Sequence, residues 1–374
     1  MPTVLDRRSL NRATLARQLL LRRADLGVPE AVEHLAGLQA QTPHSWYTGL
    51  WTRLSGFRPE HASDLLADGR LVRAATMRST IHLMTARDAV AVRPLVGIVG
   101  ERMWATNFGR RLGLSLDGVA ELVAEGRRIL EAEPLTFAEL GKRLGERWPG
   151  RDQAAMAQAV RVFETLIQVP PRGLWGRSGR ALHTTAAAWL PGVTGTVEPM
   201  PVATLVRRYL AAFGPATVRD VQTWSGLTRL AEVLDELRPE LAVFADEQGR
   251  ELFDLPDAPR PGPDVTAPPR LLYDFDNLLL SHADRSRVIT PEYLAQPFDP
   301  NGPMPSVILA DGFTAGFWRA TVTKRRATLW VAHLGRPVDV QDEAAALLAF
   351  LAPGAEHEIR DAGAGWQALL DASA

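Results

Sequence analysis

Residues 217–253 read TVRDVQTWSGLTRLAEVLDELRPELAVFADEQGRELF, and this stretch decides the fold that the sequence predicts. Thr217 and Asp220 have the spacing of a capping box, so a helix is expected to begin there and to end at the turn Ser225-Gly226. A second helix follows, with leucines at helical spacing. Two apolar runs then flank Gln248-Gly249, which predicts a β-hairpin. Helix, turn, helix and hairpin in this order are typical of a winged helix-turn-helix.

Residues 134–190 show the same order of elements more clearly. Thr136 and Glu139 form a second potential capping box, which opens a short helix. Asp152 is a good cap for a longer helix that is expected to run to Ile167. The Gly-rich and basic segment 174–183 then predicts a hairpin.

Residues 9–90 show the pattern again, at the start of the chain. Two helical segments are followed by two short predicted strands, over 73–76 and 80–85. The sequence therefore predicts three tandem winged helix-turn-helix modules, although they are not similar enough to be called a repeat.

The apolar period changes to that of strands after a proline-rich linker over 256–269. The strands are predicted over 271–275, 288–289, 307–309, 316–323 and 328–333. A closing helix is expected over 341–351, and the set indicates a small β-barrel or a curled sheet. We therefore predict an α+β fold of three winged modules and a C-terminal barrel. The expected domains are 1–95, 96–195, 196–258 and 270–374.

Composition limits the class of protein. The chain has 374 residues, of which 46% are hydrophobic and 23% charged, as in ordinary globular proteins of several domains. Cysteine is absent, which excludes a disulfide framework, a thiolate zinc site and a cysteine nucleophile. The first residues lack the apolar segment of a signal peptide, and the longest apolar run, 88–100, is too short to cross a bilayer. We expect a cytoplasmic protein.

The net charge of −1 is unevenly distributed. Residues 339–374 carry −6, so the preceding part of the chain carries +5. Apart from Lys142 and Lys324, every basic residue is arginine, whose planar fork can bind two phosphate oxygens at once. This distribution is compatible with a nucleic-acid partner, although a GC-rich genome also explains the excess of arginine.

One short motif stands out in the first module, Gln39-Ala40-Gln41 followed by Thr42-Pro43. It is expected at the C-terminal end of a helix or in the loop after it, because proline prevents the helix from continuing. Two glutamines there can simply cap backbone groups, and they can also face a site.

Three further groups of polar residues are candidates for contact with nucleic acid. One lies at the first wing, one follows the apolar run 278–280, and one forms the tip of a hairpin between two strands. For each, a structural alternative stays open: a packed histidine and solvated arginine, a turn between strands, and a solvated tip. The candidates are Arg78, His82, His282, Arg285, Arg287, Lys324, Arg325 and Arg326. Asp274 and Asp276 flank Phe275, a spacing that is more typical of a structural role than of an acid–base pair.

Leu38 to Gln41 in the first module, Arg78 to Leu83 at its wing, and Leu271 to Arg287 at the start of the C-terminal domain together resemble the AlkZ/YcaQ-like winged-helix DNA glycosylases of bacteria. The resemblance covers nearly the whole chain. It implies a C-shaped channel that embraces double-stranded DNA, and excision of N7- or N3-alkylated purines, in some members with unhooking of interstrand crosslinks. Gln39 and Gln41 match the two catalytic glutamines of the family. Members of this Gln-Gln type are associated with self-resistance to DNA-alkylating natural products.

The chemistry is physically reasonable for a cationic base. A glutamine amide does not titrate near neutral pH and is not a general base. An N7-alkylguanine, however, leaves as a neutral base, so the enzyme needs only to orient water and support a cationic sugar. The hypothesis predicts a monomeric, monofunctional glycosylase without metal or cofactor, inactive on uracil. The rival hypothesis is a non-catalytic winged-helix regulator, because fold does not fix function.

Overall fold

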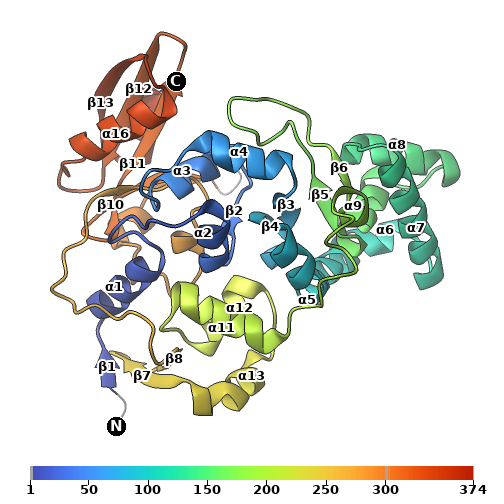
Figure 1. Ribbon diagram of the computed structural model, residues 1–374, viewed down its shortest axis with the longest axis horizontal. Helices are drawn as coiled ribbons and strands as arrows, with labels where there is room; N and C mark the ends of the chain where they lie inside the picture. Colours follow the sequence, from blue (N-terminus) through green and yellow to red (C-terminus); the bar gives the residue numbers. More distant parts are fainter. Residues whose placement is uncertain (1–2, 300–301, 303, 374) are drawn as a thin grey trace.

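The computed structural model of the chain describes residues 3–299, 302 and 304–373. Within these ranges the strands form one three-stranded and two five-stranded sheets, with helices around them (Figure 1). The fold is therefore mixed α and β, as predicted.

The central sheet has the strand order β2-β4-β3-β5-β6 and contains strands from the first two predicted modules. Its strands are β2 (Leu38–Gln39), β3 (Leu71–Ala75), β4 (Ile81–Thr85), β5 (Leu166–Gln168) and β6 (His183–Thr185). β3 and β4 are antiparallel and confirm the hairpin predicted for the first module. The helices before this hairpin are α1 (Arg7–Arg17), α2 (Val28–His34), α3 (Ser45–Trp51) and α4 (Pro59–Ala67), and the 3-10 turn η1 (Met77–Ser79) lies inside it.

A helical lobe follows the first hairpin. It consists of α5 (Ala86–Trp104), the π-helical turn η2 (Ala105–Gly109), α6 (Arg110–Leu112), α7 (Leu116–Ala132), α8 (Phe137–Arg147) and α9 (Gln153–Phe163). Thr136 and Glu139 form the predicted capping box of α8, and Asp152 caps α9 by accepting from the Ala155 N–H. The predicted extension of α9 to Ile167 is wrong, because the backbone is extended from Glu164 onward and Ile167 belongs to β5.

Residues 217–253 fold as predicted. They contain α12 (Val218–Ser225), whose Thr217–Asp220 capping box is present, then α13 (Leu230–Leu237). β7 (Ala242–Asp246) and β8 (Glu251–Asp254) form the predicted hairpin, and β1 (Thr3–Leu5) joins it in parallel with β7. The flanking elements are α10 (Ala186–Trp189), α11 (Val202–Phe213) and the 3-10 turn η3 (Arg238–Glu240).

The C-terminal sheet is open, so the predicted barrel is wrong. Its order is β13-β12-β11-β10-β9, with the first and last strands at opposite edges and unpaired with each other in the described part of the chain. Its strands are β9 (Arg270–Leu271), β10 (Ser306–Ala310), β11 (Phe313–Val322), β12 (Arg326–His333) and β13 (Glu356–Ala364). The helices are α14 (Asn277–Leu280), α15 (Pro291–Leu294), α16 (Gln341–Leu351), which has the predicted bounds, and α17 (Gly365–Ala372). The predicted strand over 288–289 is wrong, since these residues form a turn.

The hairpin predicted over 174–183 is also wrong. Trp175 instead packs its ring against Tyr47 of α3 at 4.9 Å and against Phe350 of α16 at 5.3 Å. The Tyr47 hydroxyl donates to the Gly173 carbonyl at 2.9 Å. The loop between β5 and β6, drawn in green above α4 in Figure 1, therefore docks on distant elements instead of pairing with itself.

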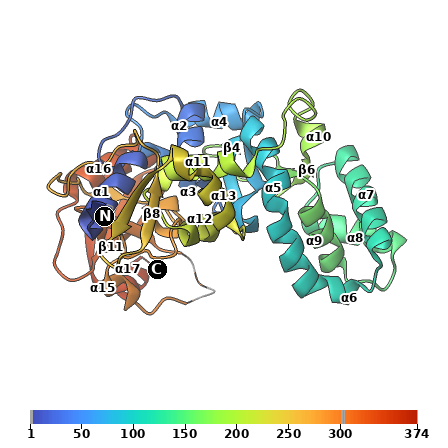
Figure 2. The same cartoon turned by 90° about the horizontal axis from the view of Figure 1, so that it is seen from below.

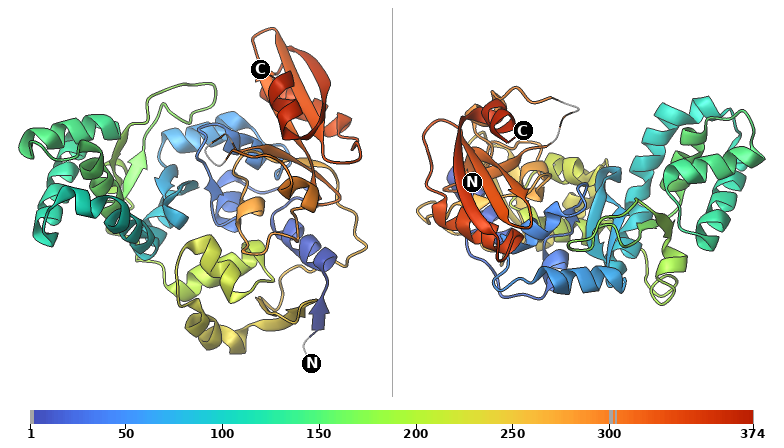
Figure 3. Two further views of the ribbon diagram at one scale, coloured as in Figure 1. Left: turned by 180° about the vertical axis from the view of Figure 1, so that it is seen from behind. Right: turned by 90° about the horizontal axis from the view of Figure 1, so that it is seen from above.

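The molecule is elongated, with the helical lobe at one end and the C-terminal sheet at the other. The views from below and from above show both ends projecting to the same side of the central elements (Figure 2 and the right panel of Figure 3).

Candidate active site

The Gln39-Ala40-Gln41 segment lies at the edge of the central sheet and not at a helix end. α2 stops at His34, and Gly37 has a φ of +87°, a conformation that favours glycine. A Cβ at Gly37 would lie 3.3 Å from the Leu83 carbonyl oxygen. β2 then pairs with β4, where Gln39 lies opposite His82, and the Ala40 N–H donates to the Ile81 carbonyl at 2.8 Å. The prediction that both glutamines lie at the end of a helix or in the loop after it is therefore wrong for Gln39, which belongs to β2.

The backbone of Gln39 is held by residues more than two hundred positions away. Its N–H donates to Oδ1 of Asn277 at 3.0 Å, and its carbonyl accepts from the Tyr273 hydroxyl at 3.0 Å. Asn277 also donates to the Gly37 carbonyl at 2.5 Å. Burial raises the pKa of Tyr273 well above its usual value, so the hydroxyl stays a donor. Residues 37–39 and residues 273–277 thus build this site together.

The side-chain amides of both glutamines are oriented by protein donors. Oε1 of Gln39 accepts from Nη2 of Arg78 at 2.8 Å, and Oε1 of Gln41 accepts from the Ile81 N–H at 2.9 Å. Neither donor can accept, so both amide oxygens must face these groups and both NH₂ groups point away. Each oxygen keeps a second lone pair for a further hydrogen bond. Gln39 is 4% exposed, whereas Gln41 is exposed to solvent.

Arg78 reaches Gln39 from a left-handed backbone conformation, with φ 54° and ψ 21°. Its Nη1 donates to the Trp224 carbonyl at 2.5 Å, so the guanidinium joins the motif to α12. Burial lowers the pKa of Arg78, although an arginine remains charged near neutral pH. The guanidinium forms no ion pair with a carboxylate of the described residues. Arg78 was predicted as a phosphate contact, and the structure places it directly against a glutamine of the motif.

Arg73 supports the backbone of the motif, and the sequence did not indicate this role. Its guanidinium is fully buried, donates to the Ala40 carbonyl at 2.7 Å and bonds the side-chain oxygen of Gln168. Burial, and then the charge of Arg172, lower the pKa of Arg73 to about 10. Arg73 is a single arginine on a predicted strand, and nothing in the sequence around it indicates that it binds the backbone of the motif.

Arg73 and Arg78, near the motif, differ from two buried arginines elsewhere in the chain. Arg17 forms an ion pair with Asp254 at 2.6 Å, and Arg53 pairs with Asp276 at 2.7 Å. Arg73 and Arg78 donate only to carbonyl and amide oxygens within the described chain. Neither guanidinium therefore has a carboxylate partner among the described residues.

His82 lies inside the protein next to this site. It is 1% exposed, and burial lowers its pKa to about 3, so the ring is neutral. Nδ1 lies 3.0 Å from the Thr80 carbonyl, which can only accept, so Nδ1 carries the proton. The imidazole ring is enclosed by the protein and does not line an open surface.

Two of the predicted contacts after residue 280 are internal. His282 lies 3.1 Å from the Phe213 carbonyl, and burial followed by the charge of Arg287 lowers its pKa to about 3. Arg287 donates to the Pro215 carbonyl at 2.9 Å. Both side chains are buried and connect this segment to α1, to α11 and to Pro215 in the loop before α12. They are not available to DNA in this conformation, because the protein already uses their polar atoms.

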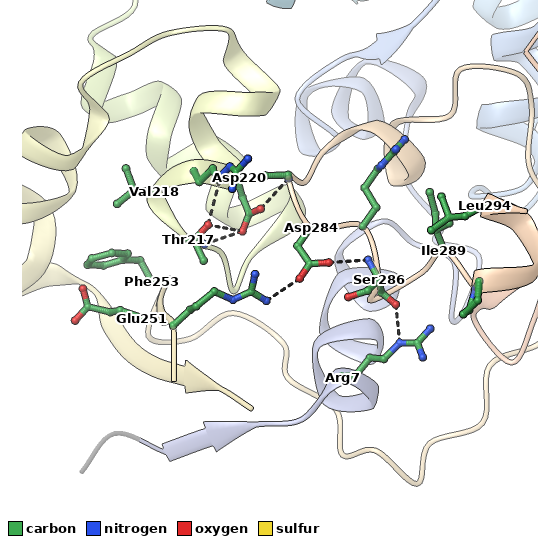
Figure 4. A pocket seen from close by; sticks show the side chains of 15 residues that line it. Arg7, Thr217, Val218, Asp220, Glu251, Phe253, Asp284, Ser286, Ile289 and Leu294 are labelled. Atoms are coloured by element: carbon green, nitrogen blue, oxygen red, sulfur yellow. Dashed lines mark hydrogen bonds and ion pairs between the residues drawn. The ribbon is translucent and has the colours of Figure 1, made fainter. Parts of the chain in front are cut away.

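Arg285 is exposed and lines a cavity of about 790 Å³ beside α12. Figure 4 shows this cavity, in which Asp284 receives a hydrogen bond from the Ser286 backbone, and Arg7 donates to the Ser286 carbonyl at 2.6 Å. Asp284 also pairs with Arg250 at 2.7 Å. The cavity therefore holds both signs of charge and is separate from the glutamine motif.

The basic hairpin tip is present where it was predicted. Lys324 and Arg325 lie between β11 and β12 and are exposed. Arg326 is exposed too, but it pairs with Glu356 of β13 at 3.1 Å. The tip projects at the upper left of Figure 1 as part of the C-terminal sheet.

Membrane-spanning helices and clusters of metal ligands are both absent from the described residues. No helix among them is long and apolar enough to cross a membrane. No group of three or more histidine, aspartate or glutamate side chains in the same ranges is arranged to hold a metal ion.

Comparison with known proteins agrees with this architecture. The family model for AlkZ-like DNA glycosylases matches residues 32–361. An interstrand DNA cross-link repair glycosylase of Streptomyces sahachiroi is 27% identical over 321 residues, which is 81% of this chain and 85% of that protein. The structure of the DNA glycosylase AlkZ of Streptomyces sahachiroi superposes with a TM-score of 0.75 at 23% identity, over 96% of this chain and 100% of the other. Because the family model matches most of the length of this chain, the chain belongs to the AlkZ-like DNA glycosylase family.

Proposed function

We propose that the protein is a monofunctional DNA glycosylase that hydrolyses the N-glycosidic bond of cationic alkylated purines, such as N7-alkylguanine, in double-stranded DNA. The observation that carries this proposal is the pair of glutamine amides held in place by fixed donors. Gln39 and Gln41 are the proposed catalytic residues.

A cationic base suits such a site, because its glycosidic bond is already weak and it departs as a neutral molecule. The remaining tasks are to hold a water near the anomeric carbon and to favour positive charge on the sugar. The free lone pair of each glutamine oxygen can accept a hydrogen bond. Gln41 is exposed and is proposed to make the direct contact, while Gln39 supports it from the buried strand.

The DNA is proposed to lie on the side to which both ends of the molecule project, so that the protein embraces it as a monomer (Figure 2). Lys324 and Arg325 are proposed to contact phosphates or enter a groove, as charged hairpins in other proteins do. Unneutralised arginines near the motif would attract the phosphate backbone over a longer range. We further propose that bulky adducts are accepted and that crosslinks are opened, since the relative from Streptomyces sahachiroi is described as a cross-link repair glycosylase. A role in general repair and one in antibiotic self-resistance both follow from such an activity.

The test is a duplex that carries one N7-methylguanine, followed by alkaline cleavage of abasic sites. The proposal expects free 7-methylguanine and strand cleavage that requires alkali, since no lyase step is involved. Duplexes with uracil in place of the lesion serve as a control and are expected to stay intact. Tight, sequence-specific binding of undamaged DNA with no base release from any alkylated duplex would instead support the regulator.

A further inference from the structure

A second cavity, distinct from that in Figure 4, is linked to the glutamine motif by a hydrogen bond between its lining residue Asp274 and Thr42. It has a volume of about 580 Å³ and lies between α3, the loop after β5 and the strand β11. Its walls combine one carboxyl group, small hydroxyl side chains and two tryptophans. The residues that matter here are Ser45, Trp175, Asp274, Trp318, Ala320 and Val322.

Asp274 supplies an acceptor that the described protein leaves unused. One carboxyl oxygen, Oδ2, accepts from the hydroxyl of Thr42, while the buried Oδ1 has no partner among the described residues. No arginine, lysine or histidine of these residues forms an ion pair with it, and burial raises its pKa although the hydroxyls of Ser45 and Thr42 oppose that shift. A buried acceptor without a donor costs free energy that a ligand N–H or O–H would recover.

Two tryptophans line the cavity. Trp175 is half-buried and Trp318 is 7% exposed, so Trp175 offers most of the ring surface to a ligand. The indole N–H of Trp318 is already used, because it donates to the Leu272 carbonyl at 2.8 Å. Trp175 is held against Phe350 with ring centroids 5.3 Å apart. Val322 also lines the cavity and is 48% exposed, so its apolar side chain can be covered by a flat group of a ligand. Aromatic surfaces of this kind favour a planar ring over an aliphatic chain.

The position of the cavity connects it with the proposed chemistry. Thr42, whose hydroxyl binds the cavity residue Asp274, directly follows Gln41 in the chain. On its other side β11 runs from Trp318 through Val322 to the basic tip at Lys324. The cavity therefore lies between the proposed catalytic residues and the proposed DNA-binding hairpin.

We propose that this cavity is a specificity site for the adduct, and that it binds a planar aromatic substituent carrying a hydrogen-bond donor, attached to the damaged base. The ring lies against Trp175 and Trp318, and its donor binds the carboxyl group of Asp274. This inference rests on the proposed glycosylase function, but it assigns a different group of residues to a different part of the substrate.

The test compares two duplexes, one with N7-methylguanine and one whose N7 carries an aromatic amide. Ala320→Phe fills the cavity from β11, and Asp274→Asn replaces the free acceptor with a group of the same shape. Thr321→Phe is the matched control, because Thr321 is the exposed neighbour of Ala320 and does not line the cavity. Single-turnover base release and equilibrium binding are measured for both duplexes.

Both cavity variants are expected to lose about tenfold in rate and in affinity for the aromatic adduct, with the methyl adduct and the control unchanged. An equal loss on both duplexes would overturn the proposal, since the cavity would then serve the base or the fold. Unchanged preference between the duplexes would overturn it too. If the wild type binds both duplexes but releases no base, the glycosylase proposal fails, while the ratio of the two affinities still decides the role of the cavity.

Discussion

The guanidinium of Arg78 donates to Oε1 of Gln39 at 2.8 Å while its second nitrogen donates to the Trp224 carbonyl. The amide of Gln39 is therefore oriented by a cation that is itself anchored on α12, in another part of the molecule. This contact fixes which end of the amide faces the arginine and which end is free.

Arg78 is accordingly expected to act as a positioning residue. Arg78→Lys keeps the charge but cannot donate to both Gln39 and Trp224, so the amide loses its fixed orientation. The turnover number should fall on the order of 10-fold to 100-fold, with little change in the affinity for undamaged DNA. Single-turnover kinetics and binding isotherms separate these two quantities. A parallel loss of DNA affinity, with an unchanged turnover number, would make Arg78 a phosphate contact instead.

The hairpin tip is expected to contribute affinity without specificity. Replacing both Lys324 and Arg325 by alanine should weaken binding to damaged and undamaged DNA alike. The slope of log K against log salt should become shallower by about 1 for each phosphate that the variant no longer neutralises. Arg128→Ala on α7 is a suitable control, because that exposed arginine is paired with Glu125 at 2.7 Å. An unchanged salt slope in the tip variant would show that the two cations are merely solvated.

The buried ion pair between Arg17 and Asp254 is expected to be needed for stability. Both side chains are 0% exposed and are joined at 2.6 and 2.8 Å, and Arg260 binds the same carboxylate. Asp254→Ala leaves a buried guanidinium without its partner, which should cost about 3–5 kcal/mol in the free energy of unfolding. Urea unfolding measures this loss. Asp68→Ala removes an exposed partner of Arg70 and should have far less effect, and similar losses in the two variants would contradict the assignment.

His82 should make the protein sensitive to acid. Its pKa is lowered by burial from 6.5 to about 3, so below pH 6.5 the unfolded chain binds a proton that the folded protein does not. The contribution of this group to stability is constant above that pH, and it falls by up to about 1.4 kcal/mol per pH unit between about pH 6 and pH 3.

His82→Asn keeps a donor for the Thr80 carbonyl and removes the titration. The free energy of unfolding of this variant should therefore depend less steeply on pH in the same range, whatever its stability at pH 8. The same pH dependence in wild type and variant would show that His82 titrates normally in the folded protein.

Local signals made much of the fold predictable. The capping boxes at Thr136 and Thr217 set where α8 and α12 begin, because a capped helix start depends on residues three positions apart. The hairpin of β7 and β8 was predictable from the turn residues Gln248-Gly249 between two apolar runs, and α16 has the bounds that were predicted for it. Interactions between residues that are only a few positions apart can be predicted from the order of the residues in the sequence.

Contacts between distant residues were not predictable. Nothing local indicates that Asn277 and Tyr273 hold the backbone of Gln39, since more than 230 residues separate them. The loop with Trp175 has the composition of a hairpin, but tertiary packing on Tyr47 and Phe350 prevails. His282 and Arg287 read as a basic surface, yet burial depends on which helices pack over them. Strand count and alternation suggested a barrel, whereas closure depends on pairing between the two edge strands.

The catalytic role of the motif is decided by the rate of base release from N7-methylguanine by Gln39→Ala and Gln41→Ala, each under single-turnover conditions. Gln367→Ala is the control, because Gln367 is an exposed glutamine of α17, at the far end of the chain from the motif. We predict that each motif variant folds, binds DNA and releases base at least about 100-fold more slowly than wild type, while the control is unchanged. Wild-type rates in both motif variants would contradict the catalytic assignment and place the chemistry elsewhere.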